Sequence, residues 1–182
     1  MDYSEIKNTK EFKGDENQCT VIASSVAFDI PYPKMHEFYA QNGRKKGKGL
    51  SGCKTNEMIV KVAKINGYKV TRYGIMKKYS YGGNSRKFAG CKYVQYIPNE
   101  GFHGEILVKS KHQLTVNNFR NYLPRGNYIF GIREHVLAVQ NGAVHDWTEN
   151  RKHKITRIWT VEKIGKKLRP NKKAKHDFSS FV

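Results

Sequence analysis

Cys19 is the first of three side chains whose type and position could perform thiol chemistry. It opens an apolar segment, residues 19–30, that contains several small residues and follows a polar, turn-forming stretch. These features predict a buried helix that begins at the cysteine. The first N–H groups of a helix lack intrahelical partners and carry a partial positive charge, so they stabilise a thiolate and lower the thiol pKa. The alternative is a small buried core residue, which free cysteines usually are.

A predicted β-hairpin supplies the other two side chains. Residues 135–140 form an apolar strand that begins with His135, and Asn141-Gly142 is typical of the type I′ turn that joins two antiparallel strands. The returning strand, residues 143–147, carries Asp146.

The hairpin register brings the histidine and the carboxylate together. Pairing around the turn sets Gln140 opposite Ala143, which leaves His135 beside the end of the returning strand. Asp146 could then accept the Nδ1–H of the imidazole, fix its tautomer and stabilise the imidazolium that forms with a thiolate. His145 is an alternative base, but it neighbours Asp146 and therefore points to the opposite face of the strand.

The rest of the chain predicts an α+β fold, with N-terminal helices packed on a C-terminal antiparallel β-sheet. Helices are expected over 19–30, 34–42, 54–66 and, capped by Thr115, 116–123. Strands are expected over 68–75, 92–97, 106–108, 127–133, 135–140, 143–147 and 154–164. We divide the chain into a polar N-terminal arm (1–16), one domain (17–164) and a basic C-terminal tail (165–182). Residues 76–104 are interpreted as an insertion that lies over the cleft.

The charge of the chain is unusual. It has 34 Lys and Arg against 15 Asp and Glu, a net charge of +19. Such a chain attracts polyanions, so we expect nonspecific, salt-sensitive binding to DNA or RNA; a bias toward lysine without a nucleic-acid partner is the alternative. The candidate nucleic-acid-binding residues are Lys166, Lys167, Arg169, Lys172, Lys173 and Lys175.

Other classes of site are disfavoured. The glycine-rich loop 43–49 lacks the Walker pattern, so we interpret it as a solvated lysine loop at the rim of the cleft. The cysteines and histidines show no metal-ligand spacing, so neither a metal nor another cofactor is predicted. Three irregularly spaced cysteines, no apolar signal region and no membrane-length apolar run predict a reducing, cytoplasmic location without membrane association.

The order of these residues resembles the papain-like cysteine peptidase superfamily, in particular small peptidase-like proteins encoded by bacteriophages. The resemblance covers about residues 17–148, apart from 76–104. It rests on Cys19, Ala23, Ile30-Pro31-Tyr32, Gly43-Arg44, Gly47, Gly49, Gly126, Tyr128, His135, Val139, Gly142 and Asp146. It implies a papain-like fold, a Cys19–His135–Asp146 triad and, for a phage protein, the host cytoplasm or the virion as its location.

Two positions depart from the family pattern. Papain-like enzymes place a glutamine six residues before the cysteine to help form the oxyanion hole, whereas position 13 here is a lysine. Gln18 or Asn17, together with the Cys19 N–H, are the candidates to replace it. Glu134 stands where the phage proteins have glycine.

These observations predict a thiol hydrolase, a cysteine peptidase that cleaves a peptide or isopeptide bond through a thioester acyl-enzyme. The same residue order serves acyl transferases, in which the acceptor is not water. The alternative is an inactive papain-like scaffold that binds nucleic acid or a host factor. The sequence does not predict an oligomeric state.

Overall fold

The computed structural model describes residues 3–78, 93–98, 106–108 and 114–165. Five helices occupy the first part of the chain: α1 (Tyr3–Lys7), α2 (Lys10–Lys13), α3 (Cys19–Phe28), α4 (Tyr32–Gln41) and α5 (Gly52–Ile65). Local signals explain their ends. Asp29 adopts a left-handed conformation (φ 54°) that ends α3, Pro31 begins α4, and the Ser51 hydroxyl accepts the Lys54 N–H to cap α5.

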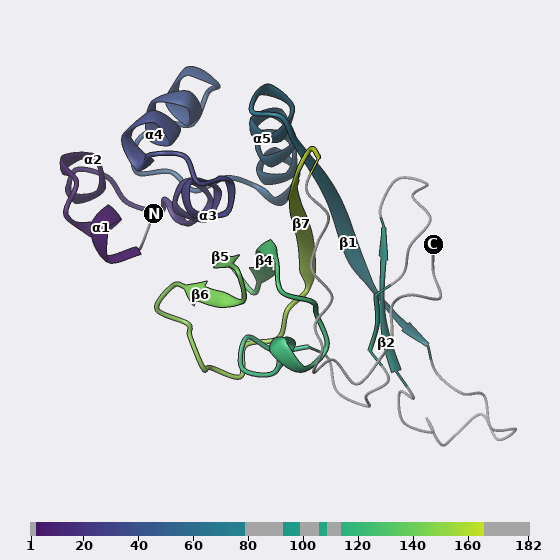
Figure 1. The fold of residues 1–182 in the computed structure, drawn as a ribbon. Helices are drawn as coiled ribbons and strands as arrows, with labels where there is room; N and C mark the ends of the chain where they lie inside the picture. The colour runs from purple at the N-terminus through teal and green to yellow at the C-terminus, as the bar shows by residue number, and fades with distance from the viewer. Residues whose placement is uncertain (1–2, 79–92, 99–105, 109–113, 166–182) are drawn as a thin grey trace, which may run out of the picture.

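The strands of the second part form an antiparallel sheet. They are β1 (Tyr68–Lys78), β2 (Tyr93–Pro98), β3 (Ile106–Val108), β4 (Asn127–Ile132), β5 (His135–Gln140), β6 (Ala143–His145) and β7 (Arg157–Lys163). Their order in the sheet is β3-β2-β1-β7-β4-β5-β6, and each pair of neighbours runs antiparallel. The molecule is therefore α+β, with its helices preceding its sheet (Figure 1).

Both faces of the central strands are buried. On one face α3 packs against β5 and β4, and α5 lies against β1. Ile129, Ala138 and Trp159 point into this helix-side core. Their neighbours Phe130, Leu137 and Ile158 point to the opposite face, where residues 114–123 cover them. Successive side chains of a strand point to opposite faces of the sheet, and both faces are buried here. The strands are therefore apolar at consecutive positions.

Residues 1–16 were expected to form a polar arm, and the structure differs from this expectation. Its described part forms α1 and α2, and Ile6 is fully buried in the helix-side core. Polar residues dominate the segment, so its few apolar anchors gave little periodic signal.

The helix expected over residues 116–123 is also wrong. The structure has only a 3₁₀ turn, η1 (Phe119–Asn121), in that segment. Thr115 and Asn118 exchange side-chain-to-backbone hydrogen bonds of 2.8 and 3.3 Å, and such local bonds compete with helix formation.

The insertion expected over 76–104 is corrected in part. The end of β1 and β2 extend the sheet away from β5 and β6, instead of lying over a cleft. The remainder of that segment, and the basic residues of the tail from Lys166 to Lys175, lie outside the described residues. Within the described ranges no helix has the length and apolar character needed to cross a membrane.

Candidate active site

The start of α3 presents Cys19 to the sheet. Cys19 is the first residue of the helix, and Gln18 makes no side-chain cap to the helix N–H groups. Because α3 packs on β5, the Cys19 thiol faces the His135 side chain and the Val136 N–H, the groups that lower its pKa most. The thiol is therefore held at the junction of the first long helix and the sheet, with one side open to a cleft.

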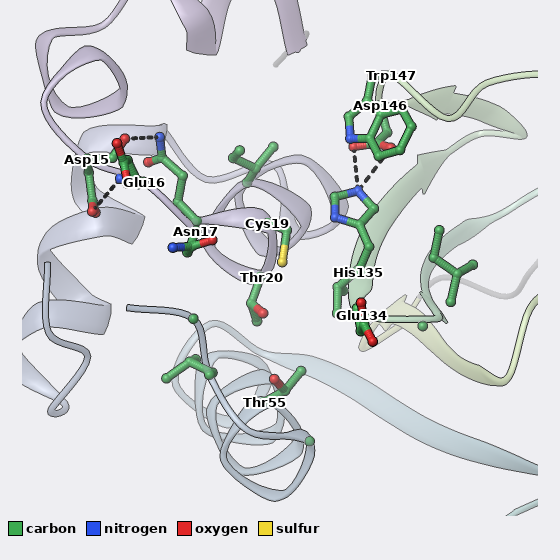
Figure 2. A pocket seen from close by; sticks show the side chains of 18 of the residues that line it. Asp15, Glu16, Asn17, Cys19, Thr20, Thr55, Glu134, His135, Asp146 and Trp147 are labelled. Carbon is green, nitrogen blue, oxygen red and sulfur yellow. Dashed lines mark hydrogen bonds and ion pairs between the residues drawn. The ribbon is translucent and has the colours of Figure 1, made fainter. Parts of the chain in front are cut away.

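His135 lies between the thiol and Asp146 (Figure 2). Its Nε2 is 3.0 and 3.1 Å from the two Asp146 carboxylate oxygens. The hairpin that joins them has the register expected from Asn141-Gly142, with Gln140 opposite Ala143 and Ala138 opposite His145. The expected nitrogen is corrected: Asp146 binds Nε2, not Nδ1, and Figure 2 shows Nδ1 on the side of the ring that faces Cys19.

The electrostatics of this group favour a thiolate–imidazolium pair. Burial raises the pKa of the Cys19 thiol, but the hydrogen bonds from His135 and the Val136 N–H, with the imidazole charge, lower it below its ordinary value overall. Burial lowers the pKa of His135, but the hydrogen bonds to Asp146 and Cys19 raise it to about 9. The proton is therefore more stable on the imidazole than on the sulfur.

Two neighbours of Asp146 complete the arrangement and were missed in the sequence. Thr148 is fully buried, and its N–H and hydroxyl donate to Asp146 Oδ2 at 3.0 and 2.7 Å. Trp147 lies against the His135 ring, with centroids 5.4 Å apart. Their adjacency to Asp146 was the available signal, but the direction of each side chain depends on the turn that follows β6.

An open cleft of about 570 Å³ surrounds the thiol. Its walls come from the loop before α3, the start of α5, the β4–β5 turn and Trp147 (Figure 2). Four carboxylates and one arginine are among its lining residues: Asp15, Glu16, Glu134, Asp146 and Arg157. Asp15 and Asp146 are bound to Arg44 and His135, whereas the side chains of Glu16 and Glu134 are exposed. Two exposed carboxylates, Glu16 and Glu134, therefore border the cleft, together with Arg157.

Gln18 does not serve the oxyanion role suggested for its side chain. Its amide donates to the carbonyls of Phe12 (3.0 Å) and Asp15 (3.2 Å), and its Oε1 accepts from the Tyr32 hydroxyl. Both amide hydrogens are thus used inside the protein. Gln18 is a structural residue that fixes the chain just before Cys19.

Asn17 retains a donor for the cleft. It adopts a left-handed conformation (φ 51°), and its Nδ2 donates one hydrogen to the Gly47 carbonyl at 3.0 Å. Its second amide hydrogen has no acceptor among the described residues. Asn17 and Cys19 line the same cleft, and the Cys19 N–H, at the first position of α3, has no intrahelical partner.

Glu134 occupies a backbone position that suits glycine. It lies in the β4–β5 turn with φ 57°, the left-handed region that side chains other than asparagine and glycine rarely adopt. The side chain is 86% exposed, 3.7 Å from the Arg133 guanidinium. It therefore borders the cleft without closing it.

No protein-family model, curated protein or solved structure matches this chain.

Proposed function

We propose that this protein is a thiol hydrolase of the papain-like type, a cysteine peptidase that acts on a peptide or protein substrate. The observation that carries the proposal is the place of Cys19 at a helix start, beside a His135 whose Nε2 is bound to Asp146, with the thiol open to a cleft. A thiolate beside an imidazolium is a ready nucleophile and a ready proton donor in one site.

The arrangement supports a two-step reaction. The Cys19 thiolate attacks the substrate carbonyl carbon, and the resulting oxyanion accepts hydrogen bonds from the Cys19 N–H and the Asn17 amide. His135 Nδ1–H then gives its proton to the leaving amine, the C–N bond breaks, and a thioester remains. His135 next takes a proton from water, whose oxygen attacks the thioester. The acid leaves and the thiolate returns, so no other co-reactant is required. An amine in place of water would make the same site an acyl transferase.

Asp146 acts through the histidine. Its carboxylate accepts from Nε2–H, which leaves Nδ1 to exchange the proton with sulfur and substrate. Thr148 holds the carboxylate by two hydrogen bonds, so its orientation does not depend on the histidine. Trp147 lies against the imidazole ring.

Selective alkylation tests the proposal, and the chain supplies an internal reference. Cys53 is an exposed free thiol at the start of α5. With iodoacetamide at pH 6, Cys19 should react at least tenfold faster than Cys53, because His135 and the Val136 N–H lower the pKa of the Cys19 thiol. His135→Ala should remove the difference. Equal rates at the two cysteines in the unmodified protein would refute an activated thiol.

Hydrolysis is tested separately. The protein should cleave members of a mixed peptide library, read by mass spectrometry, and Cys19→Ala should abolish cleavage while leaving the thermal unfolding midpoint nearly unchanged. Cleavage that persists in Cys19→Ala would assign the activity elsewhere.

A further inference from the structure

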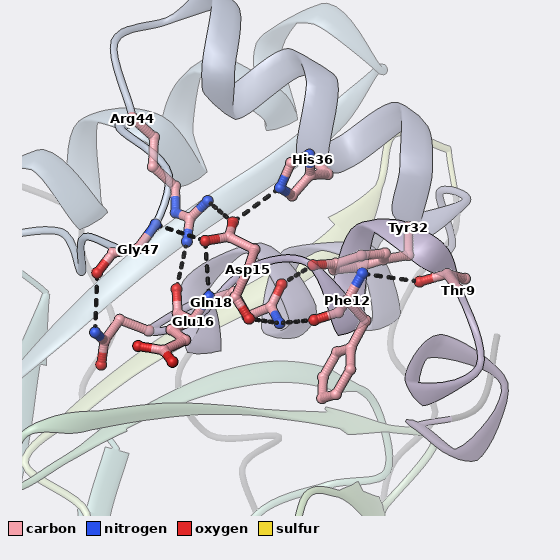
Figure 3. A network of polar contacts seen from close by, with 10 residues as sticks. Thr9, Phe12, Asp15, Glu16, Gln18, Tyr32, His36, Arg44 and Gly47 are labelled. Carbon is pink, nitrogen blue, oxygen red and sulfur yellow. Dashed lines mark hydrogen bonds and ion pairs between the residues drawn. The ribbon is translucent and has the colours of Figure 1, made fainter.

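The four residues before Cys19 are all fixed by tertiary hydrogen bonds, centred on Asp15 (Figure 3). The Asp15 side chain is 1% exposed, and its Oδ2 accepts from Arg44 Nη1 at 2.5 Å and from His36 Nε2 at 2.9 Å. Its Oδ1 accepts the N–H groups of Gly47 (2.6 Å) and Glu16 (2.7 Å). All four acceptor positions of the carboxylate are therefore filled.

Arg44 joins the same loop at a second point. Its side chain is 2% exposed, and Nη2 donates to the Glu16 carbonyl at 2.9 Å. A buried guanidinium with a carboxylate and a carbonyl as acceptors is rigid, because its planar fork fixes both bonds in one geometry. Although burial favours the neutral acid, these donors hold the pKa of Asp15 well below its usual range, so the pair stays charged at any pH at which the protein functions.

Gly47 completes the connection to the cleft. Its N–H donates to Asp15 and its carbonyl accepts from Asn17 Nδ2, so one residue contacts both. Gly43 and Gly47 have φ values of 89° and 73°, which only glycine adopts without strain. The glycine-rich loop 43–49, which suggested a phosphate site only weakly, thus has its buried arginine turned inward to the loop before the nucleophile.

We propose that Asp15 and Arg44 are positioning residues that hold the Asn17 amide where the oxyanion forms, an inference that rests on the proposed hydrolase function. Activation of the thiol comes from the other wall of the cleft, through His135, Val136 and Asp146. The two walls therefore serve different steps: the His135 wall ionises the sulfur, and the Asp15–Arg44 wall stabilises the oxyanion.

This division gives a readout that a merely structural role would not produce. The variants are Arg44→Lys, which keeps the charge but loses the planar fork, and Asn17→Ala at an exposed position. Arg120→Lys is the matched control, since Arg120 also bridges a carboxylate (Glu149, 3.1 Å) and a backbone carbonyl (Gly142, 2.8 Å), but outside the cleft lining. Two rates are measured: alkylation of Cys19 by iodoacetamide, and acylation by p-nitrophenyl acetate, followed as the burst of p-nitrophenolate.

We expect the alkylation rate of Arg44→Lys to stay within about twofold of the wild-type rate. Its acylation rate should fall by about tenfold to a hundredfold, as it does when an oxyanion donor is lost. Asn17→Ala should do the same, and the double variant should be no slower than the slower single variant, because both remove one interaction. Arg120→Lys should change neither rate.

Three results would overturn the inference: unchanged acylation in Arg44→Lys, a proportional fall in both rates, or effects of the two substitutions that multiply. If Arg44→Lys does not fold, normal acylation in Asn17→Ala refutes it instead. An unmodified protein that is alkylated rapidly but never acylated would refute the hydrolase itself and the oxyanion role with it. If the wild-type protein is acylated normally and Arg44→Lys is acylated at the same rate, only the positioning role is refuted.

Discussion

Replacement of Asp146 by asparagine tests how the imidazolium is held. Asp146 offers two acceptor oxygens, which face His135 Nε2 and the Thr148 N–H and hydroxyl. Asparagine has one acceptor and one donor group, so its NH₂ must oppose one of these donors. If it turns to Nε2, the imidazole keeps its hydrogen on Nδ1 and loses the charge-stabilising partner, as the electrostatic argument requires.

The size of the expected effect follows from the pKa of His135. Raising the pKa of His135 from its ordinary 6.5 to about 9 corresponds to about 3 kcal/mol in favour of the imidazolium. Cys19 supplies part of this, and solvent screens a side chain that is 18% exposed, so we assign about 1–2 kcal/mol to Asp146. Asp146→Asn should then slow alkylation of Cys19 at pH 7 by about fivefold to thirtyfold.

The assay is the second-order rate of iodoacetamide alkylation, with peptide mapping to assign the modified cysteine. His145→Gln is the control, because His145 neighbours Asp146 in sequence but lies outside the lining of the thiol cleft. It should stay within about twofold of the unmodified protein. Equal rates in Asp146→Asn and His145→Gln would show that the carboxylate does not support the ion pair, and the argument from Figure 2 would fail.

Four further outcomes follow. Hydrolysis should rise with pH as the thiol ionises, at a pH below that of an ordinary cysteine, and fall near pH 9 as His135 loses the proton it donates; a pH–rate profile still rising at pH 10 would contradict this. Gln18→Leu should lower the free energy of unfolding by about 2–4 kcal/mol, measured with urea, because it leaves buried hydrogen-bond partners unmatched. A cationic methanethiosulfonate should modify Cys19 faster than an anionic one, and Glu134→Gln should reduce that ratio by about twofold to threefold; an unchanged ratio would exclude a role for this carboxylate. DNA binding at low salt should weaken steeply as salt is added, and a chain ending at Gly165 should show a shallower salt dependence; equal slopes would exclude the tail.

Local patterns were sufficient for the elements that carry the proposed triad. The apolar run after Cys19 and the Asn141-Gly142 turn each specify structure within a few residues, so the helix start and the hairpin register could be derived without tertiary information. The register then placed His135 near Asp146, because antiparallel pairing leaves no freedom once the turn is known.

Tertiary structure decided which atoms meet. Asp146 binds Nε2 of His135, the Gln18 amide donates to two backbone carbonyls, and Asp15 pairs with Arg44. Each of these contacts depends on a side-chain rotamer or on a loop that brings distant residues together. Sequence spacing gives the periodicity of an element but not the direction of a polar side chain that has several partners within reach. For that reason the proposed nucleophile could be predicted from the helix that begins at Cys19, whereas the surroundings of the proposed oxyanion depended on how loop 43–49 folds back onto residues 15–17.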